Sequence, residues 1–399
     1  MQLFLFALII SGIFLCAGCA RKTNDSDTYG KPLTVWYLNN TTGLEPAIVQ
    51  AASEFSASET IAPVLYKACT ALEIQLLAEG RDIAAKPDLI IIPSEYLALL
   101  ARGNALQRTS NLNDQEITAA VQACMWKGAS WAIPIACDTR MLFINRNLFQ
   151  TDFSTALSIT FEKIWSSTAL FTGSPGGFWV THSDEPEMMY RSILPWMSIY
   201  GADVFDQNRK PVLTSSNNVQ ALASYAELAR EGTVETERYL DAAITQGTIG
   251  FGYGRASLVR NSWRNQQKGT VVTQLHHADN HASAPPIVFT TVACITRNAA
   301  NTSLATRFIA AVKKNIEHNS VSGFPTTRSY WTSSENSESQ NMKLISQSIL
   351  NGRNILSDPQ WNEVNVILQQ AYTRVVLGLA EPAQSLQQAQ YELLQLQDS

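Results

Sequence analysis

Polar side chains follow two apolar stretches that have the composition of buried strands. Asn40 comes shortly after "LTVWYL", residues 33–38, and Glu95 comes shortly after "PDLIIIP", residues 87–93. An amide both donates and accepts hydrogen bonds, and a carboxylate accepts them, so both groups suit a ligand that carries hydroxyls. If the two strands lie in one parallel sheet, both side chains belong to the edge where such sheets bind ligands. Each could equally be a solvated turn or a helix cap.

Aromatic side chains present flat apolar faces on which the C–H groups of a sugar ring can pack. The chain has 9 Trp, 12 Tyr and 15 Phe, and its polar content lies in Asn, Gln, Ser and Thr more than in charged residues. Trp179, in "GGFW", is a candidate for stacking on a ligand. A buried structural role is an equal alternative, because most tryptophans are largely buried.

Two other motifs are weak indications of a metal site and of a dinucleotide-binding site. In "LHHADNH", His276, His277, Asp279 and His281 could ligate a metal, but the spacing does not match common zinc sites, and we expect a surface loop. "GFGYG", residues 250–254, lacks the third glycine of a dinucleotide-binding loop, because Arg255 occupies that position. We therefore expect neither a metal nor another cofactor.

Catalytic motifs of the common hydrolases are missing from the sequence. Neither G-x-S-x-G nor H-E-x-x-H occurs. The enzyme hypothesis that survives is a glycoside hydrolase, because its two carboxylates leave no local signature. We expect a protein that is not an enzyme.

Charge excludes some partners. Charged residues make up 16% of the chain and the formal net charge is -5, which argues against binding to nucleic acid or to an acidic lipid surface. Beyond the N-terminal segment there are four cysteines, Cys69, Cys124, Cys137 and Cys294, none of them in a CxxC spacing. They could form up to two disulfides of unknown pairing, or remain buried thiols.

The N-terminus has the features of an export signal. Residues 1–18 contain an uncharged apolar run that is too short for a comfortable membrane span of about 20 residues. Small residues precede Cys19, as in the lipobox of bacterial lipoproteins, and this resemblance implies cleavage before Cys19 and lipidation of its thiol. An uncleaved signal anchor is the alternative. Residues 19–32 have little apolar content and read as a tether.

Strands and helices alternate through the first part of the chain. Apolar positions at helical spacing follow Pro46, a second strand is expected at "APVLY", and helices are expected at "ALEIQLLAEG" and at "SEYLALLARG", the latter ending at Gly103. This order predicts an α/β fold with a parallel sheet. Later helices are expected from residue 216 to Gly232, and from an Asp358 cap with Pro359 in the first turn to Gly378.

Six stretches, in this order, resemble the extracellular solute-binding proteins of ABC transporters, specifically the sugar-binding family that includes maltodextrin-binding proteins. They are "LTVWYLNN", "KPDLIIIPSEYLALLARGNALQ", "WAIPIACDTRMLFINRNLF", "YGADVFDQNRKPVLTSSNNVQALASYAEL", "GYGRASLVRNSW" and "SGFPTTRSYW". The third is the most specific, because it resembles the family pattern G-x-P-x-x-x-D-T-x-x-x-x-Y-N-K-x-x-F.

The resemblance implies the two-lobe periplasmic-binding-protein fold, type II, with the lobes joined by three crossovers near Cys137, Thr291 and Gly323. One lobe would comprise residues 33–136 and 292–322, and the other residues 137–290 and 323–399. The ligand would bind in the cleft, and the lobes would close on it.

Site residues follow from the same match. Asn40, Glu95 and Asp138 fall on polar or acidic positions of the family's site, and Trp263 falls on its stacking tryptophan. Asp138 could instead cap the crossover or pair with Arg140.

The function that the resemblance implies is capture of a sugar or oligosaccharide and its delivery to an ABC permease. Such a protein would be a monomer, held by its lipid on the outer face of the cell membrane or in the periplasm. Another small solute, such as a glycerol phosphate, a polyamine or a metal, is an alternative, and so is an adhesin without a transport role.

Overall fold

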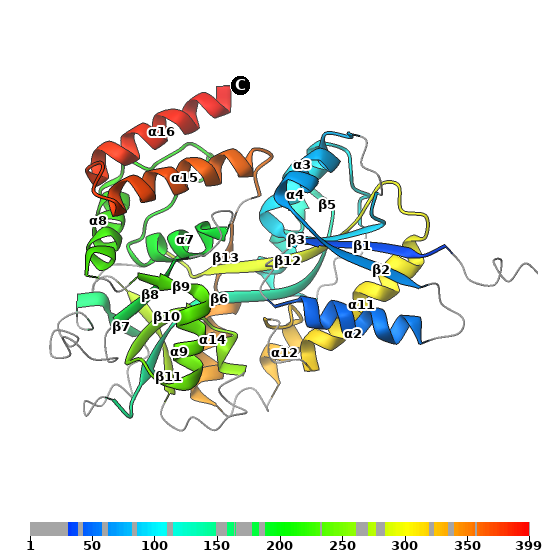
Figure 1. Ribbon diagram of the computed structural model, residues 1–399, viewed down its shortest axis with the longest axis horizontal. Coiled ribbons are helices and arrows are strands. Elements are labelled where there is room, and N and C mark those ends of the chain that lie inside the picture. Colours follow the sequence, from blue (N-terminus) through cyan, green and yellow to red (C-terminus); the bar gives the residue numbers. More distant parts are fainter. Residues whose placement is uncertain are drawn as a thin grey trace, which may run out of the picture.

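The computed structural model describes residues 31–38, 43–57, 63–81, 86–109, 115–148, 158–162, 164, 178–182, 188–231, 234–260, 270–276, 284–318, 323–333, 339–355 and 357–398. Figure 1 shows two bodies side by side, which the long strands β6 (Ile133–Asn145) and β12 (Ile287–Ile295) connect. We call the body that contains the N-terminal strands the first lobe and the other body the second lobe.

The first lobe is built on a sheet in the order β2-β1-β3-β12. Its elements are β1 (Leu33–Leu38), α2 (Glu45–Ser56), β2 (Val64–Cys69), α3 (Ala71–Ala78), β3 (Leu89–Pro93), the 3-10 turn η2 (Ser94–Tyr96), α4 (Leu97–Arg102), α5 (Thr118–Ala123), the hairpin strands β4 (Met125–Trp126) and β5 (Ala129–Ser130), and α11 (Thr302–His318). As predicted, β1 runs parallel to β2 and to β3. The strand β12, however, returns antiparallel to β3.

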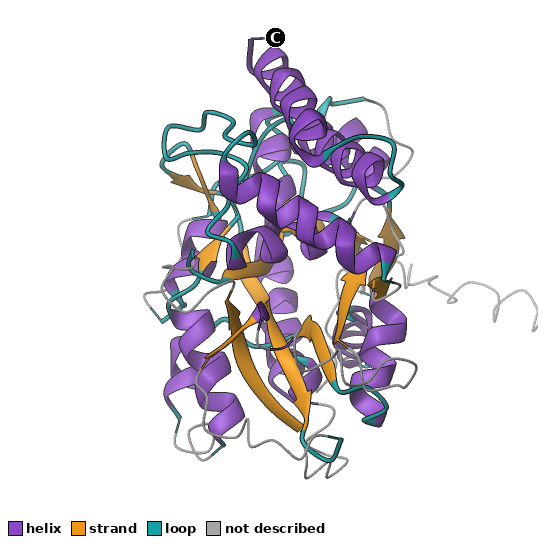
Figure 2. Cartoon of the chain, turned by 90° about the vertical axis from the view of Figure 1, so that its left-hand side faces the viewer, coloured by secondary structure: helices purple, strands orange, loops and turns teal. Residues whose placement is uncertain are grey.

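The second lobe continues the same sheet beyond the midpoint of β6. Its elements are β7 (Ser158–Thr160), β8 (Phe178–His182), α7 (Tyr190–Ile199), α8 (Ser216–Arg230), β9 (Val234–Thr236), α9 (Glu237–Gln246), β10 (Phe251–Arg255), β11 (Thr270–His276), α12 (Arg328–Thr332), α14 (Gln340–Leu350), β13 (Arg353–Asn354), α15 (Trp361–Val376) and α16 (Pro382–Asp398). Strands β10 and β11 both pair antiparallel with β6. Helices lie on both sides of the strands (Figure 2).

The run "GFGYG" lies largely in strand β10 and does not form a phosphate-binding loop. A Cβ on Gly252 or Gly254 would lie 3.0 Å or less from carbons of Ile244, which belongs to α9. The two glycines therefore let α9 approach the sheet closely.

The three segments where we predict crossovers lie together in space. Thr290 of β12 pairs with Cys137 of β6, and Cys137 also pairs with Phe324, next to Gly323. Gly323 has φ +86°, and a Cβ there would lie 3.1 Å from the Cys137 carbonyl oxygen, so this position requires glycine. The exact division of the chain between the lobes stays a prediction.

The last two helices pack onto the second lobe, and one of them begins later than we expect from the sequence. The N-cap of α15 is Gln360, so our prediction of an Asp358 cap is wrong. The Asp358 carboxylate accepts a hydrogen bond from the Gln360 amide at 2.8 Å and pairs with Arg209, which holds it outside the helix. The predicted end at Gly378 is confirmed by its φ of +70°.

Two absences apply to the described ranges only. Within them, no helix is long and apolar enough to cross a membrane.

The described ranges include all four cysteines beyond the N-terminal segment: Cys69, Cys124, Cys137 and Cys294. Each is a buried free thiol, so the alternative of buried thiols holds and the alternative of disulfides does not.

Candidate functional site

A buried cluster joins the two lobes where β3 ends. It consists of Glu95 from η2, Tyr190 and Arg191 from the start of α7, Phe289 from β12 and Trp361 from the start of α15, and we call it the junction cluster. Glu95 and Tyr190 are 0% exposed and Arg191 is 3% exposed. Charged residues are rarely buried to this degree unless they are paired or bind something.

Aromatic rings enclose the charged groups of the junction cluster. The Tyr190 and Trp361 rings meet edge to face with centroids 5.1 Å apart, and the Arg191 guanidinium lies 5.1 Å from the centre of the Phe289 ring. Arg191 Nε donates to the Tyr190 hydroxyl at 3.3 Å. These contacts fix the guanidinium beside Glu95.

Several polar atoms in and beside the junction cluster are buried without a hydrogen bond of standard geometry to any described residue. They are both carboxylate oxygens of Glu95, Arg191 Nη2, Ser192 Oγ, Thr290 Oγ1, Arg140 Nη1 and Trp361 Nε1. An orphaned buried polar atom costs about 1–3 kcal/mol, and charged atoms cost more. Because native proteins leave few buried polar atoms without partners, their number in this region makes it a candidate site for a ligand or for water.

The electrostatics of Glu95 reflect its burial. Burial raises the pKa of Glu95 above its usual range, while Arg191, the Glu95 backbone and the Tyr190 and Ser94 side chains act to lower it. Desolvation outweighs them, so the carboxylate gains stability from any added hydrogen-bond donor.

Asp138 lies on β6 near the junction cluster, and internal hydrogen bonds occupy its carboxylate. It accepts from the Thr139 amide at 2.8 Å, from the Ser257 amide at 3.1 Å and from the Ser257 hydroxyl. Asp138 is 6% exposed, and burial raises its pKa, which Arg255 and these hydrogen bonds act to lower. The pairing with Ser257 and Thr139 gives Asp138 a structural role at the crossover, and its role as a ligand-binding residue stays a prediction.

Arg140, two residues along β6, ties the junction cluster to α9. Its Nε donates to the Arg191 carbonyl oxygen at 3.2 Å, and its Nη2 pairs with Glu237 at 2.9 Å. Arg255 also pairs with Glu237, at 3.0 Å. Against the effect of burial, these two arginines lower the pKa of Glu237 to about 2. Arg140 therefore positions the start of α7, and with it Arg191.

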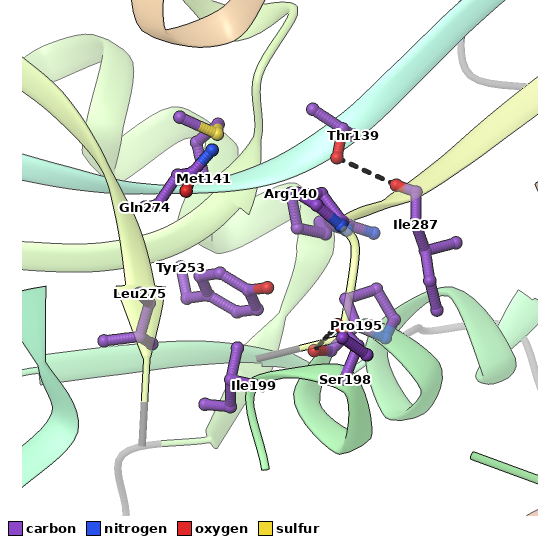
Figure 3. Close-up of a pocket in the computed structure, with 12 residues that line it drawn as sticks. Thr139, Arg140, Met141, Pro195, Ser198, Ile199, Tyr253, Gln274, Leu275 and Ile287 are labelled. Carbon is purple, nitrogen blue, oxygen red and sulfur yellow. Dashed lines mark hydrogen bonds between the residues drawn. The ribbon is translucent and has the colours of Figure 1, made fainter. Parts of the chain in front are cut away.

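A small cavity lies on the second-lobe side of Arg140. Figure 3 shows Thr139, Arg140 and Met141 on β6, Tyr253 on β10, and Pro195, Ser198 and Ile199 on α7 around it. Its volume is about 30 Å³. A cavity of this volume has room for water against Arg140.

Trp179 lies on another face of the second lobe. Its ring centroid is 6.2 Å from that of Tyr239 in α9, and it packs against the apolar cluster that contains Leu240 and Ile244. The junction cluster instead lies against α7. A stacking role for Trp179 stays a prediction, and its observed contacts are those of a core residue.

The remaining sequence-based candidates lie outside the described residues. Asn40 and Trp263 are among them, as are Cys19 and the residues His277, Asp279 and His281. Across the part of the chain that the structure does describe, no group of three or more His, Cys, Asp or Glu side chains could hold a metal.

Arg191, Tyr190 and Trp361 are the site residues that sequence reasoning missed. They come from elements remote in sequence from Glu95, so no local spacing connects them. One signal was available, because Arg191 is the single charged residue in "MMYRSILPWMSIY", residues 188–200. A lone arginine in an apolar helix is buried when the helix packs, and it needs a partner there.

Comparison with known proteins supports the architecture through structure and not through sequence. No family model matches the chain, and no curated protein matches it. The GacH receptor of Streptomyces glaucescens, solved unliganded and with acarbose, matches with a TM-score of 0.74 at 15% identity, over 92% of this chain and 98% of that one.

Two further structures match equally well. An ABC transporter solute-binding protein from Agrobacterium radiobacter K84 in complex with ribitol has a TM-score of 0.74 at 18% identity, over 92% of this chain and 99% of that one. Maltose-bound T. maritima MalE3 has a TM-score of 0.74 at 14% identity, over 92% and 100%. This chain therefore has the two-lobe α/β fold of the ABC transporter solute-binding proteins.

Proposed function

We propose that this protein binds a sugar or polyol between its two lobes and delivers it to an ABC permease. The observation that carries the proposal is the junction cluster, in which buried polar atoms without partners gather between the lobes of a solute-binding fold. A sugar provides hydroxyls for those atoms and C–H faces for aromatic rings such as Tyr190 and Trp361. The structural relatives bind acarbose, ribitol and maltose.

Capture requires the lobes to move. Because Glu95, Tyr190 and Arg191 are buried, a solute reaches them after the lobes separate, and it then stabilises the closed arrangement. A permease that recognises the closed form would accept the loaded protein. The protein performs no chemistry on the solute in this scheme.

The membrane anchor is part of the same proposal. Lipidation at Cys19 after removal of residues 1–18, with residues 19–32 as a tether, would keep the receptor close to its permease. The intact mass of the protein purified from membranes tests this step. A mass that includes residues 1–18 without added acyl chains would contradict it.

A thermal-shift screen tests the binding function. The soluble form, residues 24–399, is heated with sugars, polyols, amino acids, polyamines, glycerol phosphates and divalent metals. A solute at a hundredfold over its Kd adds about 2.7 kcal/mol to the free energy of unfolding, which gives a clear shift. We expect a shift with a sugar or polyol, and a smaller radius of gyration by small-angle scattering.

Two variants separate the junction cluster from general stability. Glu95→Ala should abolish the solute-induced shift, whereas Gln388→Ala, on the exposed surface of α16, should leave it unchanged. A shift only with polyamines or metals, or one that persists in Glu95→Ala, contradicts the proposed site.

A further inference from the structure

Positive charges gather at one end of the first lobe. The formal net charge of -5 argues against an acidic partner for the molecule as a whole, but the charges are not spread evenly. Five exposed cations lie at this end, and we call them the basic patch: Lys86, Arg102, Arg108, Lys127 and Arg297. None of the five forms an ion pair with a residue that the structure describes.

Segments remote in sequence meet in the basic patch. The Arg297 amide, shortly after β12, donates to the Ala105 carbonyl oxygen at 2.7 Å. The Thr296 hydroxyl donates to the Pro87 carbonyl oxygen at 2.6 Å. The end of β12 therefore lies between Lys86 and the end of α4, and their cations share one surface.

A hairpin with two tryptophans extends this surface. Trp126 of β4 and Trp131, just after β5, meet edge to face with ring centroids 6.3 Å apart. The Lys127 ammonium lies 4.8 Å from the centre of the Trp126 ring, and the Arg108 guanidinium lies 5.2 Å from that of Trp131. A Cβ on Gly128, at the tip, would meet no described atom within 4 Å, so the tip projects from the lobe. Tryptophan beside cations is typical of surfaces that bind a membrane–water interface.

Two described acids at this end have partners of their own. The Asp88 carboxylate accepts from the Thr34 amide at 2.9 Å and from the Ala300 amide at 2.8 Å. Glu79 pairs with Arg81 at 2.7 Å. Neither acid pairs with the basic patch, whose cations are left to attract an external anion.

The proposed tether joins the lobe at the same end. Residues 19–32 lead directly into β1, and the hydrogen bond from Thr34 places the start of β1 beside Asp88, shortly before β3. A flexible segment of this length spans about 20 Å. Glu95 and the rest of the junction cluster lie at the opposite end of β3.

We propose that the basic patch binds the anionic lipid surface to which the tether holds the protein. The first lobe then rests on the membrane with its cleft turned toward the surrounding solution. Cations near an anionic leaflet are attracted within a Debye length, and the tether keeps this end of the lobe at a high local concentration. The choice of lipid as the partner rests on the anchor in the proposed function.

Co-sedimentation with vesicles tests the proposal on the soluble form, residues 24–399. Vesicles of phosphatidylcholine are compared with vesicles that also contain about one third phosphatidylglycerol, an anionic lipid. We expect binding to the anionic vesicles alone. Raising the salt concentration about tenfold should release the protein, because salt screens exposed charges.

Variants locate the binding surface. Arg108→Gln, Lys127→Gln and Arg297→Gln should each weaken binding about fivefold, and the triple variant about a hundredfold. Arg108→Lys keeps the charge and should bind as wild type does. Lys343→Gln is the matched control, because Lys343 is exposed on α14 of the second lobe, and it should change nothing. Circular dichroism checks that each variant is folded.

The outcomes separate this proposal from the proposed function. If wild type binds both kinds of vesicle equally or binds neither, or if Lys343→Gln weakens binding as much as the patch variants do, the membrane contact is wrong. Binding to soluble polyglutamate but not to vesicles would assign the basic patch to an acidic protein instead. Solute binding is measured independently by the thermal-shift screen, and the triple variant should keep the solute-induced shift of wild type.

Discussion

Two buried carboxylates at the lobe boundary differ in what surrounds them. Asp138 accepts well-formed hydrogen bonds from Thr139 and Ser257, whereas Glu95 has only contacts of poorer geometry with the Tyr190 and Ser94 side chains. Burial raises the pKa of both. A carboxylate that its own protein satisfies fully contributes to the fold, and one that is satisfied less well gains more from a ligand. The two residues therefore call for different experiments.

Glu95→Gln should stabilise the solute-free protein at neutral pH by about 1–3 kcal/mol, because the amide removes the cost of a buried unsatisfied charge. A raised pKa means that the folded protein holds the proton more tightly than the unfolded chain. The wild-type free energy of unfolding therefore falls as pH rises from about 4.3, the usual glutamate value, through the folded-state pKa. Glutamine does not titrate, so the difference in the free energy of unfolding between Glu95→Gln and wild type should vanish toward pH 4. Urea denaturation at pH 4 and at pH 7 measures this difference. A difference that does not change with pH would contradict a raised pKa of Glu95 as its cause.

Substitutions of Asp138 should act mainly on stability. Asp138→Ala leaves the amides of Thr139 and Ser257 and the Ser257 hydroxyl without their acceptor, and should cost about 2–4 kcal/mol. Asp138→Asn keeps one oxygen for the two amides and should cost about 1 kcal/mol or less. Thermal unfolding compares the two. If Asp138→Asn unfolds normally but loses all solute binding, the predicted ligand-binding role is correct and our structural interpretation is incomplete.

Among the elements, the pair α3 and α4 shows how a correct prediction can have a different cause. The sequence predicts that the helix ends at Gly103, and α4 does end there. Glycine often ends a helix because it adopts the left-handed conformation without strain. Gly103, however, has φ -71°, which any residue adopts. A Cβ at this position would lie 2.0 Å from the Ala78 carbonyl oxygen of α3. Glycine is required here by the close approach of two backbones and not by backbone conformation.

Gly103→Ala should therefore destabilise the protein by more than about 2 kcal/mol, since the obstructing atom is backbone and cannot move without shifting α3. Gly378→Ala is the matched control. It has φ +70° but open space around it, so it should cost only about 1 kcal/mol of left-handed strain. Chemical denaturation of both variants makes the comparison. A loss at Gly103 no larger than the loss at Gly378 would contradict the close contact with Ala78 as the reason for glycine.

Local patterns predict the elements of this fold well, and they predict the site in part. The strands at 33–38 and 87–93 and the helix from Pro46 follow from hydrophobic periodicity, which acts over neighbouring residues. Glu95 follows from its place after a buried strand. The partners Arg191 and Trp361 do not, because tertiary packing brings α7 and α15 to the end of β3. Our prediction that Asp358 caps α15 was wrong, because Arg209, which is also remote in sequence, pairs with the Asp358 carboxylate.

At the scale of the whole molecule, the segment before α15 connects the second lobe to the turn that carries Glu95. The Ser357 hydroxyl accepts a hydrogen bond from the Ala98 amide at 2.7 Å and donates to the Glu95 carbonyl oxygen at 3.2 Å. Arg209 in turn binds the Ser357 carbonyl oxygen at 3.3 Å. This contact fixes the backbone of Glu95 relative to the C-terminal helices.

Ser357→Ala should cost about 1–3 kcal/mol of stability and also weaken solute binding, since it frees the backbone that positions Glu95. Ser385→Ala is a matched control, because the buried Ser385 hydroxyl donates to the Ala371 carbonyl oxygen within the α15–α16 pair. It should lose stability without losing affinity. Calorimetric titration of both variants checks this. An unchanged Kd in Ser357→Ala would limit the contact to a structural role.

The return of β12 into the first lobe has a consequence for the order in which the protein can fold. β3 ends at Pro93, but β12, its partner in the sheet, begins at Ile287. A nascent chain that contains the whole of β1 to β6 still lacks the strand that joins β3 to β6. The first lobe therefore completes late, and contacts so distant in sequence form slowly.

The rate at which buried thiols become protected from alkylation during refolding measures when the first lobe forms. Cys69 lies in β2, Cys124 follows α5 and Cys294 lies in β12, so all three belong to the late lobe. In pulsed alkylation during refolding, we expect the three to become protected in one phase, at the time when β12 enters the sheet. Early protection of Cys69 and Cys124 would instead mean that the N-terminal strands form a stable unit before the chain returns.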